Sequence, residues 1–340
     1  YTGRLKDAAA NKPPDEPSPD INLEWVRAPA RAIGALILQQ HGMIEAAIRT
    51  AEDARTLAML GSRPDTESLD LHGFCWFFGY WANGSPEAGR QALEEVEENS
   101  NPDVQAAVYL SGLVEAGAAL LAAQEGRWRD AADQSRQLLD QLRVSDGYGL
   151  RPLLHAVHAL ALAAMGERER AIPAFRRALR ERRGVSSAIE GFRRRMLVRT
   201  RQWLRLGDPH IAALELAEWA REQEVQLVEL EALHIAACES RATARAILPR
   251  ARQLASAVDL TISNVILDHI EKIVAGVTAT DVDEPELRLL AELGLWLPLP
   301  VTGGLSARER EVALFASLGY STRFIAERLQ HSVRTVDTPL

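Results

Sequence analysis

A repeat of about forty residues is the feature that most constrains how this chain can fold. Gly42, Gly84, Gly126, Gly166 and Gly207 follow one another at separations of 42, 42, 40 and 41 residues. Each glycine stands between two segments whose apolar residues recur at helical spacing. Because glycine tolerates a positive φ, each is expected to end one helix and to start a tight turn into the next.

A second periodic signal supports these turns. Five positions after each glycine stands a small residue, namely Ala47, Gly89, Ala131, Ala171 and Ala212. A small side chain at that point lets the second helix of a pair approach the first closely. Ser85-Pro86 and Asp208-Pro209 also place an N-cap before a proline at the first helical position.

These periods resemble the helix pairs of tetratricopeptide-like solenoids. We therefore predict an all-α protein whose residues 21–278 form an α-solenoid of about five to six helix pairs, acting as a sensor or interaction domain. Residues 1–20 hold four prolines among charges and are expected to be extended or mobile. Residues 279–304 are expected to be a linker with one short helix, which sets off residues 305–340. The alternative is an irregular helical bundle whose glycines coincide by accident.

The charge balance restricts where nucleic acid could bind. The 340 residues carry a formal net charge of −8, so any contact with phosphate must be local. Cys75 and Cys238 are far apart and lack CxxC spacing, which argues against a disulfide framework. No uninterrupted apolar run of about 18 residues occurs. These features predict a cytoplasmic protein with no membrane partner.

The last 36 residues carry helix signals of their own. Ser306 and Glu309 have the spacing of a capping box, and the helix that they open is expected to stop at Gly319. A second N-cap, Ser321 or Thr322, precedes another short helix. The predicted apolar side of the first helix consists of Val312, Leu314, Phe315 and Leu318.

After a short turn at residues 330–332, Ser332 is expected to cap a third helix that begins at Val333. Two short helices joined by such a turn are the layout of a DNA-reading helix-turn-helix. The segment resembles LuxR-type DNA-binding domains, whose shared run is Leu-Thr-x-Arg-Glu-x-Glu-Val, then Gly-x-Ser-x-x-x-Ile-Ala-x-x-Leu, then Ser-x-x-Thr-Val. The matching residues are Leu305, Ser306, Arg308, Glu309, Glu311, Val312, Gly319, Ser321, Ile325, Ala326, Leu329, Ser332, Thr335 and Val336.

The resemblance implies a small domain of a bacterial transcription regulator in which the helix from Val333 onward reads DNA. The residues that it implies as DNA-facing are Ser332, Arg334, Thr335, Asp337 and Thr338. For Ser332 the alternative is a helix cap alone, and Arg308 with Glu309 is expected to form an internal pair. Pro339 departs from the family, in which His is usual, and proline costs about 3 kcal/mol in a helix interior. The domain is therefore expected to be truncated in or after its recognition helix.

A helical-repeat domain followed by such a unit resembles the C-terminal half of the large ATP-binding, MalT-like LuxR regulators. In those proteins an NTPase domain precedes the solenoid, and the solenoid senses an inducer or a protein partner. This chain has no GxxxxGK[ST] run, so no ATP site and no cofactor are implied. The implied partners are promoter DNA, an unidentified small-molecule inducer or protein, and a second copy of the chain in a homodimer.

Two clusters could form the ligand or partner surface of the solenoid. Aromatic residues crowd one predicted helix around Trp76 and Tyr80, where they could line a pocket or pack between repeats. Arginines are concentrated between residues 168 and 205, and the densest points are Arg182, Arg183, Arg193, Arg194 and Arg195. An arginine stripe could hold an acidic partner or a phosphorylated ligand, and the alternative is a solvated helix face.

Metal and catalytic chemistry have less support in the sequence. His155-x-x-His158 and His234-x3-Cys238 each place two ligands on one helix face, but neither has further ligands nearby in the chain, so no metal site is predicted. No nucleophile elbow or paired-carboxylate motif occurs, and no enzyme is predicted. The predicted function is DNA-binding transcription regulation. The alternative is an interaction scaffold with a truncated or vestigial helix-turn-helix.

Overall fold

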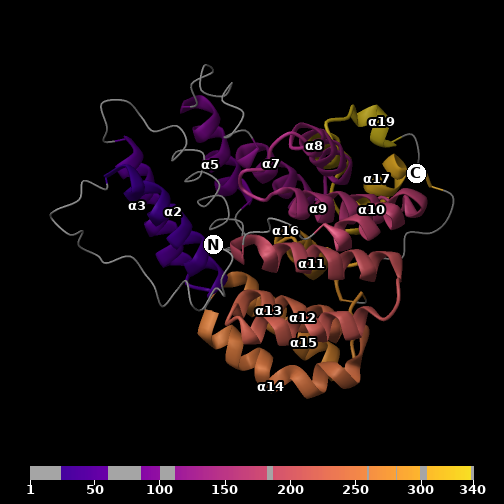
Figure 1. Ribbon diagram of the computed structural model, residues 1–340. Coiled ribbons are helices and arrows are strands. Elements are labelled where there is room, and N and C mark those ends of the chain that lie inside the picture. The colour runs from indigo at the N-terminus through magenta and orange to yellow at the C-terminus, as the bar shows by residue number, and fades with distance from the viewer. Residues whose placement is uncertain are drawn as a thin grey trace.

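The computed structural model describes residues 24–59, 86–99, 112–181, 187–258, 260–280, 282–298 and 305–337, and all regular elements in these ranges are helices. This confirms the all-α class for the described residues (Figure 1). The helices are α2 (Glu24–Gln40), α3 (Ile44–Met59), α5 (Pro86–Asn99), α7 (Leu113–Gln124), α8 (Trp128–Gln141), α9 (Arg151–Ala164), α10 (Arg168–Arg180), α11 (Ser187–Leu204), α12 (Pro209–Glu222), α13 (Gln226–Glu239), α14 (Arg241–Val258), α15 (Thr261–Ala275), α16 (Glu284–Glu292), α17 (Ala307–Ser317), α18 (Thr322–Arg328) and α19 (Val333–Asp337). None of the described helices is both long and apolar enough to cross a membrane.

The turns predicted from the glycine spacing are present wherever the structure describes them. Gly42, Gly126, Gly166 and Gly207 have φ values of 77°, 74°, 73° and 64°, and each lies between two helices of a pair. Gly84 lies outside the described residues. The small residues five positions later, Gly89 among them, are all buried, as close contact between paired helices requires. Asp208 caps α12 as predicted, because its Oδ1 accepts hydrogen bonds from the backbone N–H groups of His210 and Ile211.

We call α2 to α15 the helical array. Helix α9 lies inside it and packs on α7, α8, α10 and α11. Its alanine-rich sequence is buried on almost every side, which lets four helices approach it closely. The array also curves back on itself, because α2 contacts α11 and α13. There the Nδ1 atom of His41 donates to the carbonyl oxygen of Glu224 at 2.8 Å, and Gly42 packs against Val258.

Residues 293–297, which we call the strap, follow α16 and pack onto the array. Leu293, Leu295, Trp296 and Leu297 are all buried. The strap is held by Arg199 of α11, whose Nη1 donates to the carbonyl oxygen of Gly294 at 2.7 Å. The short helix expected within the linker at residues 279–304 is present as α16. The leucines and the tryptophan that follow it bury apolar surface against the array.

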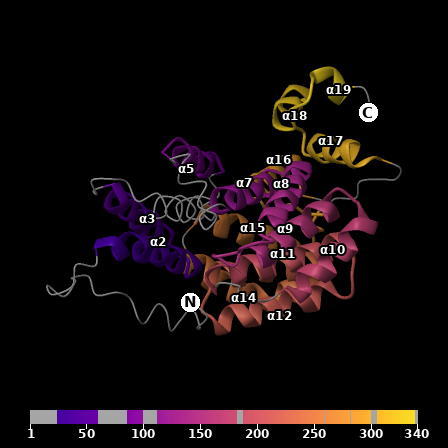
Figure 2. The same cartoon turned by 45° about the horizontal axis from the view of Figure 1, so that its top comes forward.

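Helices α17, α18 and α19 form a small C-terminal unit beside α8 and α16 (Figure 2). The capping box predicted at its start is confirmed, since the Glu309 carboxylate accepts from the Ser306 N–H at 2.7 Å and Ser306 Oγ accepts from the Glu309 N–H at 3.3 Å. Ser321, rather than Thr322, caps α18. The four residues predicted for the apolar side of α17 are buried, and Gly319 ends that helix with a φ of 69°.

Candidate functional site

The C-terminal unit presents α19 to solvent. Ser332, Arg334 and Asp337 are exposed, Thr335 is half-buried, and Val336 anchors the helix in the core of the unit. Thr338, also predicted to face DNA, lies outside the described residues. The fold therefore gathers four of the five predicted residues at one exposed helix.

An open cleft runs between α19 and the start of α17. It is lined by Ser306, Arg308, Glu309, Val312, Ser332, Arg334 and Thr335. The sequence predicts an internal pair between Arg308 and Glu309, and no contact of Arg308 with DNA. In the structure Arg308 is exposed on the same cleft as Arg334, while Glu309 is occupied with the capping box. Two arginines against one glutamate give the lining of this cleft a net positive charge on an acidic chain.

Ser332 is a helix cap, as its alternative interpretation held. Its Oγ accepts from the backbone N–H of Thr335 at 3.1 Å and shares a hydrogen bond of 2.6 Å with the Thr335 hydroxyl, in which either oxygen can donate. This fixes both hydroxyls at the N-terminus of α19.

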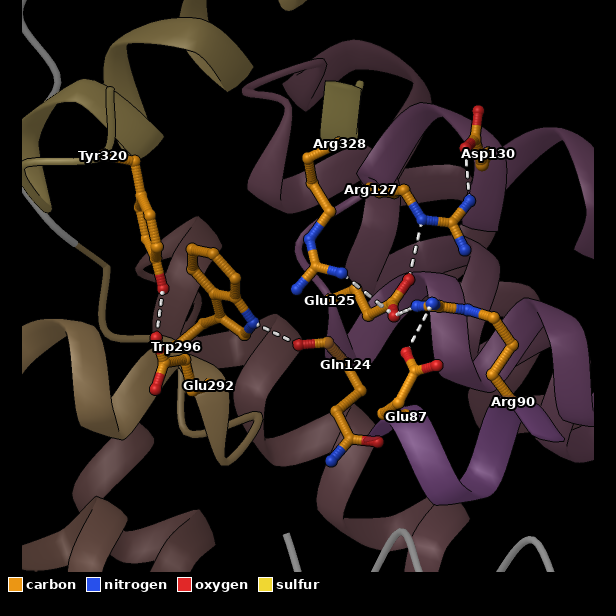
Figure 3. A network of polar contacts seen from close by, with 10 residues as sticks. All are labelled: Glu87, Arg90, Gln124, Glu125, Arg127, Asp130, Glu292, Trp296, Tyr320 and Arg328. Carbon is orange, nitrogen blue, oxygen red and sulfur yellow. Dashed lines mark hydrogen bonds and ion pairs between the residues drawn. The ribbon is translucent and has the colours of Figure 1, made fainter. Parts of the chain in front are cut away.

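The opposite side of the unit is docked on the array, and Trp296 of the strap lies at the centre of this docking contact. Its ring makes edge-to-face contacts with Trp128 of α8 and Phe315 of α17, at centroid distances of 5.7 and 5.4 Å. Its Nε1 donates to the carbonyl oxygen of Gln124 at 2.7 Å (Figure 3). A side chain at Gly126 would collide with this ring, so the turn glycine also admits the tryptophan. The core thus runs without a break from the array into the C-terminal unit.

A carboxylate with three arginine partners lies next to Trp296. Glu125 is 1% exposed at its side chain and pairs with Arg90, with Arg127 at 2.8 Å and with Arg328 at 3.1 Å (Figure 3). Arg90 comes from α5, Arg127 from the turn before α8, and Arg328 from α18. One buried anion is therefore neutralised jointly by the array and the C-terminal unit, and separating them would remove one of its cations.

Arg288 of α16 holds the C-terminal end of α17. Arg288 donates to the carbonyl oxygens of Leu318 and Gly319 at 2.8 to 3.1 Å, which satisfies acceptors that a helix leaves unpaired at its C-terminus. Its guanidinium also lies 4.8 Å from the Tyr320 ring centroid. The Tyr320 hydroxyl donates to Glu292 at 3.1 Å (Figure 3).

Glu311 of α17 caps the N-terminus of α8 from a distance. No side chain from the residue before α8 does so, and instead the backbone N–H of Arg129 donates to Glu311 Oε1 at 2.8 Å. Glu311 is 3% exposed, and this burial raises its pKa from an ordinary value of 4.5 to about 7, against the lowering effect of the Arg129 N–H and guanidinium. A docking residue at this place therefore changes its charge near neutral pH.

Glu311→Gln is expected to make the protein more stable at pH 8. Between pH 4.5 and 7 the folded carboxyl keeps a proton that the unfolded chain has released, so the wild-type stability falls as the pH rises, by about 3 kcal/mol over the whole interval. Glutamine keeps an oxygen for the Arg129 N–H and does not titrate. Urea unfolding at pH 5.5 and pH 8 measures the difference. The exposed Glu327→Gln should behave like the wild type, and parallel pH curves for the wild type and Glu311→Gln would contradict the assignment.

The predicted arginine surface is largely internal where the structure describes it. Arg193 and Arg195 are 3% and 7% exposed, and they pair with Glu190 and Glu231 respectively. These two side chains are therefore not exposed as the prediction expected, because each guanidinium pairs with a carboxylate. Arg194 is part-exposed and lies 4.6 Å from the Trp219 ring centroid.

The remaining residues predicted for that surface, Trp76, Tyr80, Arg182 and Arg183, lie outside the described residues. Sequence reasoning also missed Trp296, Glu125 and Glu311 as docking residues. For Trp296 the one local signal in the sequence was its place in the proline-rich run at residues 296–300.

Comparison with protein-family models, with curated proteins and with solved structures found no match. The geometry of the site is therefore the guide to its function.

Proposed function

We propose that this protein is a DNA-binding transcription regulator whose C-terminal unit, α17 to α19, acts as a LuxR-type helix-turn-helix. The observation that carries the proposal is the exposure of α19 after a capped turn, with Ser332, Arg334 and Thr335 on one open cleft while the opposite side of the unit is docked. A short helix that is anchored at its base and exposed along its edge can enter the major groove.

The proposal assigns a different role to each group. Arg334 and Arg308 supply positive charge for contact with DNA phosphates. Because the whole chain has a net charge of −8, such a contact has to be local. Ser332 and Thr335 place two hydroxyls at the start of α19, and such hydroxyls can hydrogen-bond phosphate oxygens. Asp337 is exposed at the end of the described helix and would contribute to base selection.

The helical array would then receive the signal, a small molecule or a protein, and pass it through the docking contact. Trp128, Trp296 and Phe315 form an unbroken row of rings from the array to the C-terminal unit. A shift of α8 or of the strap would move α17 and change the direction in which α19 points. This is the sensing role that the resemblance implies.

Arg334→Ala is expected to weaken specific DNA binding by about 1 to 3 kcal/mol, because a guanidinium contact to a base or phosphate is lost. The measurement selects a binding sequence for the full chain from a pool of random duplexes and then follows the salt dependence of binding by fluorescence anisotropy. Arg252→Ala, an exposed arginine of α14, is the matched control and should bind as the wild type does. No selected sequence at low salt, or equal loss in both variants, would reject DNA reading by this unit.

A second candidate is an interaction scaffold in which the C-terminal unit only covers α8 and the strap. The continuous core through Trp296 and Phe315 favours it, because such packing would also stabilise a unit that has no DNA to read. The same selection experiment distinguishes the two, since a scaffold returns no preferred duplex.

A further inference from the structure

Two helices of the array bring three metal-binding side chains together beneath the surface. His234 and Cys238 lie one turn apart on α13, and His269 faces them from α15. Both histidines are buried, whereas Cys238 retains some exposure. The sequence showed only the first two, since the third lies 35 residues further along the chain.

The ligand atoms converge on one point. His234 Nε2 lies 2.7 Å from His269 Nδ1 and 3.7 Å from Cys238 Sγ, and all three atoms lie within 4.8 Å of one another. A tetrahedral ion with bonds of about 2.05 Å to nitrogen and 2.3 Å to sulfur needs separations of about 3.3 Å between nitrogens and about 3.6 Å between nitrogen and sulfur. The distance from Cys238 Sγ to His234 Nε2 already fits, and the two nitrogens need to part by about 0.6 Å. Cys238 Sγ and His269 Nδ1, which lie within 4.8 Å of each other, need to come to about 3.6 Å.

The orientation of His269 is set from outside the cluster. Its Nε2 lies 3.1 Å from the carbonyl oxygen of Ala279, which can only accept, so Nε2 carries the ring proton and Nδ1 directs its lone pair at His234. A backbone carbonyl that fixes the second nitrogen in this way is the usual support of a metal-bound histidine.

We propose that His234, Cys238 and His269 bind a transition-metal ion of the Zn²⁺ class, with the fourth position left to water. One thiolate and two imidazoles are donors that Zn²⁺ takes readily. On binding, the Cys238 S–H bond breaks and its proton leaves to solvent, while His234 moves its proton from Nε2 to Nδ1. Nothing is oxidised or reduced. The ion would join α13 to α15 just before the chain continues through Ala279 toward α16 and the strap.

Zinc binding by the full chain with Cys75→Ser tests the proposal, because Cys238 is then the remaining thiol. After removal of metal with a chelator and dialysis against Zn²⁺, elemental analysis should find one equivalent of zinc, and thermal unfolding should shift upward. Cys238→Ser and His269→Gln, made in this background, should each weaken binding about 100-fold or more, since even supporting residues of such sites contribute about 10- to 100-fold. His158→Gln on α9 is the matched control and should retain the zinc.

Co²⁺ gives a readout that does not depend on the variants folding. In the chain that carries Cys75→Ser and no further substitution, Co²⁺ should produce the intense visible bands of a tetrahedral ion. A thiolate-to-cobalt charge-transfer band should accompany them. Absence of stoichiometric zinc, equal zinc in Cys238→Ser, or a Co²⁺ spectrum without the thiolate band would each overturn the site. DNA binding is independent of all three results.

Discussion

Trp296→Ala is expected to destabilise the protein by about 3 to 5 kcal/mol and to detach the C-terminal unit from the array. The ring is 5% exposed and lies between Trp128 and Phe315, so its removal leaves a cavity that two large rings cannot fill. It also deletes the donor to the Gln124 carbonyl oxygen. Urea unfolding measures the loss of stability, and limited proteolysis followed by mass spectrometry locates the new cleavage sites.

The comparison for this variant is Trp219→Ala on α12. Trp219 is only partly buried and lies under the Arg194 guanidinium, away from the docking contact. Trp219→Ala should lower the stability less than Trp296→Ala does, and it should leave the protease cleavage pattern of α17 to α19 as in the wild type. If Trp296→Ala keeps α17 to α19 protected, the docking contact does not depend on this ring.

Glu231→Gln is expected to cost about 3 to 5 kcal/mol, because it removes the buried carboxylate that pairs with the buried Arg195 guanidinium. Glu231 and Arg195 are both buried and paired, and Arg199 is close enough to feel both. Burial, followed by the charge of Arg195, already lowers the pKa of Arg199 to about 10, and Glu231 opposes that decrease. With a neutral residue at 231, two cations face each other beside the strap. Urea unfolding again measures the effect.

Two controls separate charge from shape. Glu271→Gln removes one partner of the Arg252–Glu271 pair, whose side chains are 59% and 42% exposed, and should change stability by at most about 1 kcal/mol. The double variant Glu231→Leu with Arg195→Met should recover much of the loss, since an apolar pair needs no compensation. A double variant as unstable as Glu231→Gln would mean that altered packing, rather than the missing Glu231 charge, lowers the stability.

The helix boundaries could be predicted from the sequence because each depends on a local demand. A positive φ at Gly126 or Gly166, and the caps at Ser306 and Asp208, act within a few residues of where they occur. Such signals need no knowledge of the rest of the chain.

The side-chain contacts between one helix pair and the next could not be predicted, because the two residues in each contact are far apart in the chain. Arg168 with Leu204, Gln202 with Glu239 and His210 with Thr243 lie 36, 37 and 33 residues apart. A dense run of arginines looks like a solvated face until the carboxylates of the next pair are placed against it, as Glu231 is against Arg195. Glu311 is the extreme case, since the helix that it caps begins more than 180 residues earlier.

The contact of α2 with α11 and α13 has a consequence for how the array transmits strain. In an open stack of repeats each unit feels only its two neighbours, and a disturbance fades along the series. Here the first described pair also contacts later helices of the array, because His41 donates to the carbonyl oxygen of Glu224 and Gly42 packs against Val258. A displacement near the end of α12 or of α14 can therefore reach α2 directly, without passing through every helix between them.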